Sequence, residues 1–327
     1  MSDPALVPID SMMIPRFSQP ATFFRTPWLE PTADVDIALI GVPFDFQSNR
    51  AGARHGPAQI REMSRLVRRF NANGGESPFD ICTVADLGDA PVIPIDITRS
   101  VQLIIQFVRS LSERGITTVS AGGDHGVTYP VLKGLAPKEP VGMVHFDAHV
   151  DTYHDAWGDL YNHGTLLRRC VEEGLIDPRR TVSVGIRGSR FTLDDRDYHR
   201  DNGMRLISFD EFEDLGRAKV IEEIRRVVGD GPTYVTFDID ALDAGYCMGT
   251  GSPEPGGMTM RDAQVVLRGL AGLDIIGGDV CEVSPPLDPT NHTALNGANI
   301  MFELLCLVAP GVAKRKMAQG AMAVAAK

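Results

Sequence analysis

The segment HFDAHVDTYHD, residues 145–155, concentrates ionisable side chains: it holds three aspartates and three of the eight histidines of the chain. Side chains two positions apart on an extended chain point to the same side of it. Asp147, His149 and Asp151 can therefore converge on one point. Carboxylates and imidazoles are the groups that bind hard and borderline divalent metal ions, so this spacing predicts a metal site.

Three further segments place polar side chains directly after apolar runs: AGGDHG at 121–126, TFDID at 236–240 and CEVSPP at 281–286, which contains Glu282. The candidate metal-binding residues are His125, Asp147, His149, Asp151, Asp238 and Asp240. So many carboxylates at one place repel one another strongly unless cations neutralise them. Oxygen-rich ligands with one or two imidazoles suit Mn²⁺, with Ni²⁺, Co²⁺ or Fe²⁺ as alternatives. The number of ligands is sufficient for two ions that activate a water molecule.

Other polar residues of these segments have ordinary structural explanations. Asp124, taken alone, is equally well explained as the N-cap of a helix. His145 lies deeper in its strand, so we expect a packed or hydrogen-bonded core histidine. The residues expected to be solvated or to support the site from outside are His154, Asp155, His55, His199 and His292. The sequence contains no P-loop, no G-x-S-x-G elbow and no dinucleotide-binding glycine pattern in context.

Short β-rich runs alternate with amphipathic helical stretches along the chain. The predicted strands are residues 35–42, 81–85, 116–121, 141–146, 181–186, 204–208, 233–237 and 273–280. The predicted helices are residues 57–70, 98–114, 128–134, 165–173, 216–228, 260–270 and 294–307. This alternation is typical of a mostly parallel sheet covered by helices, which carries its sites where the strands end. The polar segments follow predicted strands at those ends.

Composition limits the class of protein. The 327 residues are 43% hydrophobic and 23% charged, and no linker or repeat divides them, so we expect a single domain over 1–327 with an N-terminal arm of about 30 residues. The net charge of -11 argues against a nucleic-acid-binding surface and favours a small cationic substrate.

Five cysteines without C-x-x-C spacing indicate reduced thiols. The first residues lack the pattern of a signal peptide, and the apolar runs are too short to span a bilayer. We therefore expect a cytoplasmic protein that contacts no membrane.

The motifs GGDHG, FDAHVDTYHD, NHGT, TFDIDALD and EVSPP, in this order and spacing, resemble those of the ureohydrolases, the family of arginase and agmatinase. The resemblance covers nearly the whole chain. It implies a three-layer α/β/α fold around a parallel sheet of about eight strands. It also implies two divalent metal ions, usually Mn²⁺ and in some relatives Ni²⁺, and a trimer or hexamer built as a homo- or hetero-oligomer.

The resemblance also implies roles for single residues. His125 and Asp151 match ligands of one ion, and His149 and Asp240 match ligands of the other. Asp147 and Asp238 match carboxylates that bridge both ions.

Two further residues of the motifs match groups that act on the substrate. His163, in NHGT, matches the histidine that passes a proton to the leaving amine. Glu282 matches the carboxylate that holds the guanidinium. The implied reaction hydrolyses a guanidino compound to urea, or a urea derivative, and an amine, with His163, Asp151 and Glu282 at the reacting centre.

Departures from the arginase pattern argue against arginine as the substrate. Asp151-Thr152 is followed by Tyr153, as in agmatinases, whereas the longer loop to His163 resembles guanidinopropionase and guanidinobutyrase. The candidate substrate-binding residues are Glu282, Tyr153, Trp157, Phe46, Met248 and Arg190. An apolar wall would suit guanidine, an alkylguanidine or a biguanide such as metformin, whereas Arg190 would suit a guanidino acid. The altered loop 244–248 borders the site.

Two other functions remain open at this point. One is agmatinase, and the other is a mainly structural subunit of a hetero-oligomer, which would be expected to lose metal ligands. A deacetylase-type site with a single zinc ion is disfavoured by the second set of carboxylates.

Overall fold

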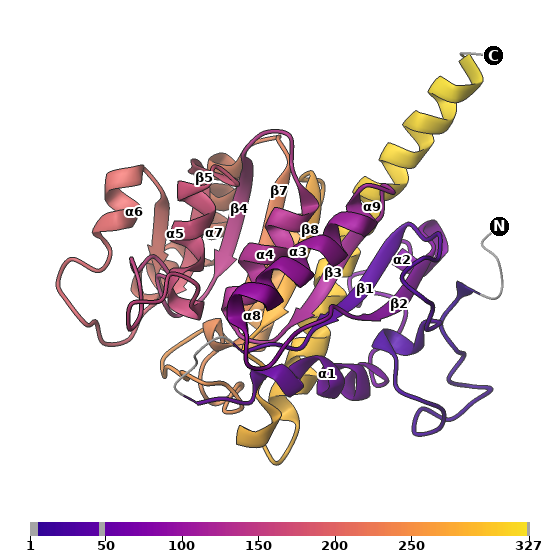
Figure 1. The fold of residues 1–327 in the computed structure, drawn as a ribbon, viewed down its shortest axis with the longest axis horizontal. Coiled ribbons are helices and arrows are strands. Elements are labelled where there is room, and N and C mark those ends of the chain that lie inside the picture. Colours follow the sequence, from indigo (N-terminus) through magenta and orange to yellow (C-terminus); the bar gives the residue numbers. More distant parts are fainter. Residues whose placement is uncertain (1–5, 46–49, 326–327) are drawn as a thin grey trace.

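The computed structural model describes residues 6–45 and 50–325, with side chains described up to residue 318. Its centre is an eight-stranded sheet in which neighbouring strands run parallel, in the order β2-β1-β3-β8-β7-β4-β5-β6 (Figure 1). The strands are β1 (Ile37–Val42), β2 (Val84–Asp89), β3 (Thr117–Gly122), β4 (Val141–Phe146), β5 (Ile176–Ile186), β6 (Arg205–Ser208), β7 (Thr233–Asp238) and β8 (Ile275–Cys281). The predicted parallel α/β class is confirmed.

Helices cover both faces of the sheet, and strands such as β1, β4 and β7 are therefore buried along their whole length. The helices are α1 (Gly56–Ser64), α2 (Pro78–Ile81), α3 (Ile97–Ser112), α4 (Thr128–Leu135), α5 (Leu166–Glu172), α6 (Asp197–Asn202), α7 (Phe209–Val228), α8 (Met260–Gly269) and α9 (His292–Ala325). Strand β1 shows the alternation: Ile37 and Leu39 join the core under α7, α8 and α9, whereas Ala38 and Ile40 join the core under α3, α4 and α5. The three-layer α/β/α expectation is therefore confirmed.

All eight predicted strands are present, and all except 141–146 have shifted ends. The run 81–85 was displaced most, because Ile81 ends α2 and β2 starts only at Val84. Helices α2 and α6 were not predicted. Helix α7 is interrupted at Gly216, where φ is 72°, and its second part corresponds to the predicted helix 216–228. Its first part, which was not predicted, starts at Phe209, because the Ser208 side chain accepts from the Glu211 N–H and caps it there. Helix α9 continues to Ala325, well beyond the predicted end at 307, and its last turns extend away from the body (Figure 1).

The N-terminal segment is irregular, as expected, but its middle is anchored rather than lying loosely on the surface. Phe23 and Phe24 are buried. The Phe23 N–H donates to Asp86 on β2, and the Phe24 N–H donates to Ser64 on α1. These bonds tie the arm to the edge of the sheet.

Helix α9 is the one helix of the described residues that is long and apolar enough to cross a membrane, over His292–Ala318. Its most apolar window is 72% buried inside the fold, where it packs on β8, α1 and α8. Core packing therefore accounts for its apolar sequence.

Candidate metal centre

The polar segments meet because their strands are neighbours. Strands β3, β8, β7 and β4 are consecutive in the sheet, and all four end at the same edge. His125 follows β3, Glu282 follows β8, Asp238 ends β7, and Asp147 follows β4. Parallel strands bring their carboxyl ends together at one edge, so residues up to 157 positions apart in the chain come into contact there.

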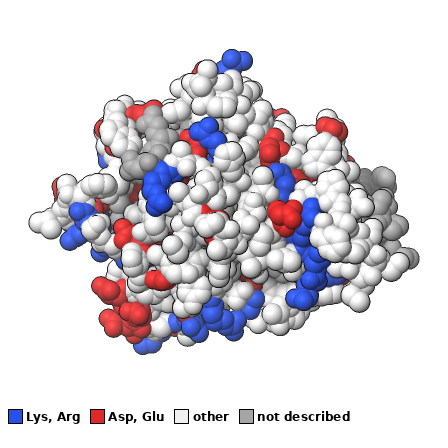
Figure 2. Space-filling model, turned by 90° about the horizontal axis from the view of Figure 1, so that it is seen from below, with Lys and Arg blue, Asp and Glu red and all other residues white. Residues whose placement is uncertain are grey.

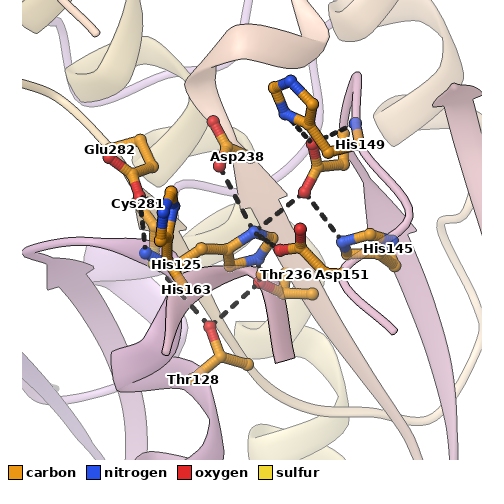
Figure 3. A network of polar contacts seen from close by, with 12 residues as sticks. His125, Thr128, His145, His149, Asp151, His163, Thr236, Asp238, Cys281 and Glu282 are labelled. Carbon is orange, nitrogen blue, oxygen red and sulfur yellow. Dashed lines mark hydrogen bonds and ion pairs between the residues drawn. The ribbon is translucent and has the colours of Figure 1, made fainter. Parts of the chain in front are cut away.

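One group of side chains surrounds Nδ1 of His125 (Figure 3). This atom lies 3.0 Å from Oδ2 of Asp147, 3.1 Å from Oδ2 of Asp151 and 3.3 Å from Oδ2 of Asp238. All four residues are buried. Three buried carboxylate oxygens thus face one buried imidazole nitrogen.

A second group forms around His149, whose ring is partly exposed. Its Nδ1 lies 3.2 Å from Oδ2 of Asp240 and 3.3 Å from Oδ1 of Asp147. Asp147 therefore belongs to both groups, with Oδ2 directed to His125 and Oδ1 directed to His149. This shared carboxylate suits a pair of cations bound side by side.

The electrostatics of the cluster favour a bound positive charge. Burial raises the pKa of Asp238 well above its usual value, and repulsion from Asp240 and Asp147 adds to this rise. Burial and repulsion from Asp147 likewise raise the pKa of Asp151. Burial also raises the pKa of Asp240, to about 6. Burial and mutual repulsion disfavour the ionised form of these carboxylates, and bound divalent cations would stabilise it. The carboxylate oxygens and imidazole nitrogens of the cluster therefore fit metal ions.

His125 is oriented by a hydrogen-bonded chain on its other side. Its Nε2 lies 2.7 Å from Oγ1 of Thr236, and that hydroxyl donates to Oδ1 of Asp279 at 2.6 Å. Because the Thr236 hydroxyl donates its only hydrogen to Asp279, it can only accept from His125, so Nε2 of His125 carries a proton. Nδ1 is then the nitrogen that faces the cluster, where its lone pair would be available to a bound metal ion.

His163 and Glu282 form an ion pair beside the cluster. Nδ1 of His163 lies 3.3 Å from Oε1 of Glu282, which also accepts from the backbone N–H of His125 at 3.0 Å. His163 is held on the short 3-10 helix His163–Thr165, whose N-cap Asn162 makes a capping box with Thr165. The two residues that the resemblance assigns to proton transfer and substrate binding are thus in contact.

This ion pair predicts a pH-dependent stability of the metal-free protein. Burial lowers the pKa of His163, but the hydrogen bond and charge of Glu282 outweigh it and raise the pKa from 6.5 to about 9. A histidine whose pKa is higher in the folded than in the unfolded protein stabilises the fold fully at pH values below the unfolded-state pKa. This stabilisation is lost as the pH rises through the folded-state pKa. We expect calorimetry of EDTA-treated samples to give the parent protein a higher free energy of unfolding than Glu282→Gln, by up to about 3 kcal/mol at pH 6.5 and below. This difference should disappear as the pH rises from 6.5 to 9. A constant difference over this range would contradict the assignment.

Two residues of the site have left-handed backbone. The φ of Asp151 is 49°, and that of Glu282 is 64°. Residues other than glycine rarely adopt this conformation, which costs about 1–3 kcal/mol of conformational free energy for each residue. It turns the chain sharply after β4 and β8, which directs both carboxylates into the cluster.

Of the predicted substrate residues, Tyr153 lies beside the site. Its backbone N–H donates to the carbonyl of Gly164, next to His163. Its ring meets Phe191 edge-on, with centroids 5.7 Å apart. Arg190, adjacent to Phe191, donates to the Leu193 carbonyl and keeps part of its side chain exposed. The segment from Arg190 therefore lies next to Tyr153.

Two of the remaining substrate candidates, Trp157 and Met248, are largely exposed. Trp157 is 74% exposed and Met248 is 69% exposed. Met248 lines a separate cavity of about 300 Å³ with Tyr246, Leu287 and Pro289. Phe46 lies outside the described residues. An apolar wall formed by these side chains is not observed among the described residues.

The supporting residues divide between expected and unexpected positions. Asp124 caps the short helix His125–Val127 by accepting from the Gly126 N–H, and His145 is buried and hydrogen-bonded, both as expected. His55, His154, Asp155 and His292 are exposed. His199, on α6, is buried, so of its two expected situations it has the supporting one and not the solvated one. Thr236, Asp279 and Ser183 were missed, since a single polar residue inside a strand carries no spacing signal.

Figure 2 views the molecule from below the sheet of Figure 1. Lysine and arginine side chains form separate groups there, interspersed with aspartate and glutamate. This face shows no continuous basic stripe among its described residues, in agreement with the net charge of -11.

Comparisons with known proteins agree with this geometry. The model of the Arginase family matches residues 35–306. Guanidinopropionase of Pseudomonas aeruginosa is 50% identical, over 96% of this chain and 99% of that one. Mitochondrial agmatinase of Gallus gallus is 43% identical, over 94% and 90%. The solved structure of proclavaminate amidinohydrolase from Streptomyces clavuligerus has a TM-score of 0.86 and 36% identity, covering 91% of this chain and 99% of that one.

Proposed function

The chain belongs to the arginase family and is a ureohydrolase of a guanidino compound other than arginine, and on this premise we propose that a short guanidino acid is its substrate. The observation that carries the chemistry is the sharing of Asp147 by two ligand groups, with the His163–Glu282 pair beside them. This arrangement places a candidate binding carboxylate and a proton carrier next to a two-cation site.

The family depends on two metal ions, and the cluster provides ligands for both. We propose that His125 and Asp151 hold one ion and that His149 and Asp240 hold the other. Asp147 and Asp238 would contact both. Manganese is the proposed metal, with nickel as the alternative. When bound, the two ions lower the pKa of water and so supply the nucleophile.

The residues of this chain then bind the substrate and move a proton. The planar guanidinium matches a carboxylate through paired N–H donors, so Glu282 would bind and orient it. His163, protonated through its contact with Glu282, would donate a proton to the amine as the C–N bond breaks. The products are urea and the amine of the remaining chain.

The far end of the substrate is assigned from the residues next to Tyr153. Arg190, whose Nη1 lies 4.0 Å from Oδ1 of Asp195, supplies a partly exposed cation next to Phe191, which packs on Tyr153. A cation there suits the carboxylate of a guanidino acid. The 50% identity with guanidinopropionase supports the same choice. Agmatine is the second candidate, since a 43% identical relative is an agmatinase and Tyr153 follows the same pattern.

A panel of substrates tests this proposal. We expect kcat/KM for guanidinopropionate or guanidinobutyrate to exceed the values for agmatine, arginine, guanidine and metformin. Replacement of Arg190 by alanine should lower kcat/KM for the guanidino acids by roughly 10–100-fold, because a hydrogen bond to a charged group is lost. The same variant should leave the value for agmatine unchanged. A preference for agmatine, guanidine or metformin would reject the guanidino acid.

We also propose a cytoplasmic enzyme with one domain over residues 1–327, because one sheet carries both hydrophobic cores. A trimer or hexamer, built as a homo- or hetero-oligomer, is the proposed assembly. A mainly structural subunit is disfavoured because the chain keeps all six candidate ligands together with His163 and Glu282.

A further inference from the structure

A row of polar residues crosses the sheet directly beneath the metal cluster. Adjacent strands pair in register so that Ser120, Asp279, Thr236, His145 and Ser183 are successive partners on β3, β8, β7, β4 and β5. All five are buried. His145 and Thr236 lie two positions before Asp147 and Asp238, so the row and the cluster share one face of the sheet.

Three residues of this region form a chain that starts at Asp147. Nε2 of His145 lies 3.0 Å from Oδ2 of Asp147, the oxygen that also faces His125. Nδ1 of His145 lies 3.0 Å from Oγ of Ser183. The same hydroxyl lies 2.9 Å from Nε2 of His199, which α6 supplies.

The direction of each hydrogen bond follows from the carboxylate. Asp147 is ionised and only accepts, so Nε2–H of His145 donates to it. Nδ1 of a neutral His145 then accepts the Ser183 proton, and Ser183 in turn accepts Nε2–H of His199. This order leaves only an acceptor, Nδ1 of His199, without a partner, in agreement with the contacts of the described residues.

The reverse order is less favourable. It would place a buried N–H at Nδ1 of His199 with no acceptor, and buried orphan donors are rarer than buried orphan acceptors. Burial is the main cause that lowers the pKa of His199, to about 3. His199 therefore stays neutral at physiological pH and carries only one N–H.

We propose that Ser183 and His199 are positioning residues that hold the ring of His145 in place and thereby orient Asp147 for metal binding. The proposal rests on the proposed role of Asp147 as a shared ligand. Without the Ser183 hydroxyl, Nδ1 of His145 loses its hydrogen-bond partner, and the ring is held only through Nε2. The ring and the Asp147 carboxylate to which it donates could then turn together away from the cluster.

Mn²⁺ binding to EDTA-treated full-length protein, measured by equilibrium dialysis, tests the proposal without relying on turnover. We expect Ser183→Ala to weaken Mn²⁺ binding by roughly 10–100-fold, the usual effect of removing an outer partner of a metal ligand. Ser183→Thr keeps the hydroxyl and should bind Mn²⁺ as the parent does. The matched control is Thr181→Val, which removes another buried hydroxyl of β5, one that donates to the Asp177 carbonyl instead.

His199 provides a second pair of variants. His199→Gln keeps an N–H at the end of the side chain and should retain most of the affinity, whereas His199→Leu should lose it as Ser183→Ala does. Parent-like Mn²⁺ affinity in both Ser183→Ala and His199→Leu would overturn the proposal, as would equal losses in Ser183→Ala and Thr181→Val. If the parent itself failed to bind Mn²⁺, the metal assignment of the proposed function would fail instead.

Discussion

Asp147→Ala is expected to release no measurable urea and to retain less metal than the parent protein. Asp147 is fully buried and faces His125 through Oδ2 and His149 through Oδ1, so its removal breaks both ligand groups at once. The loss should exceed the roughly 10–100-fold typical of an outer partner of a metal site. Metal analysis of the purified protein and a urea assay with the preferred substrate provide the measurements.

Two further variants make this result specific. Asp147→Asn keeps the volume of the side chain and removes its charge, so it separates loss of a ligand from a cavity in the core. Asp155→Ala removes an exposed carboxylate of the same segment and should behave as the parent does. If Asp147→Ala kept both metal ions and full activity, the metal centre would be assigned wrongly.

His163→Ala is expected to lower kcat by roughly 10²–10⁴-fold, the usual contribution of a positioned general acid or base. His163 contacts Glu282 and lies outside both ligand groups, so the metal content should remain that of the parent. His154→Ala, which removes an exposed histidine of the same loop, is the matched control. Loss of metal from His163→Ala would instead identify His163 as a ligand.

The two variants together separate the functions of the site. Asp147→Ala should lose metal and turnover together, whereas His163→Ala should lose turnover alone. The difference follows from position: Asp147 lies between two imidazoles, while His163 pairs with a carboxylate that also accepts a backbone N–H of the metal-binding segment.

Much of the fold and the core of the site followed from local patterns. The run Val141–Phe146 was predicted with its observed ends, because it is apolar throughout and buried on both faces. Its continuation into Asp147, His149 and Asp151 showed the two-residue period that identifies ligands on one face. The ends of helices and strands were predicted less accurately where a capping side chain sets the end, as at Ser208, or where a short helix such as α2 precedes the strand.

The substrate pocket was less predictable, since its residues belong to loops. Tyr153 lies at the site because its backbone is bonded to Gly164. Met248, which the sequence suggested for the same wall, lines a different cavity with Leu287 and Pro289. Loop conformation depends on contacts with distant segments, and the residue types alone do not specify it.

The sequence by itself determined the chemistry of this protein: residue types and two-residue spacing identify the carboxylates and imidazoles, and strand periodicity places them at strand ends. The tertiary structure decided which strands are neighbours and in which register they pair. Ser183 lies opposite His145 only because β5 pairs with β4, and α6 brings His199 to it. These pairings join distant parts of the chain, so no local pattern records them.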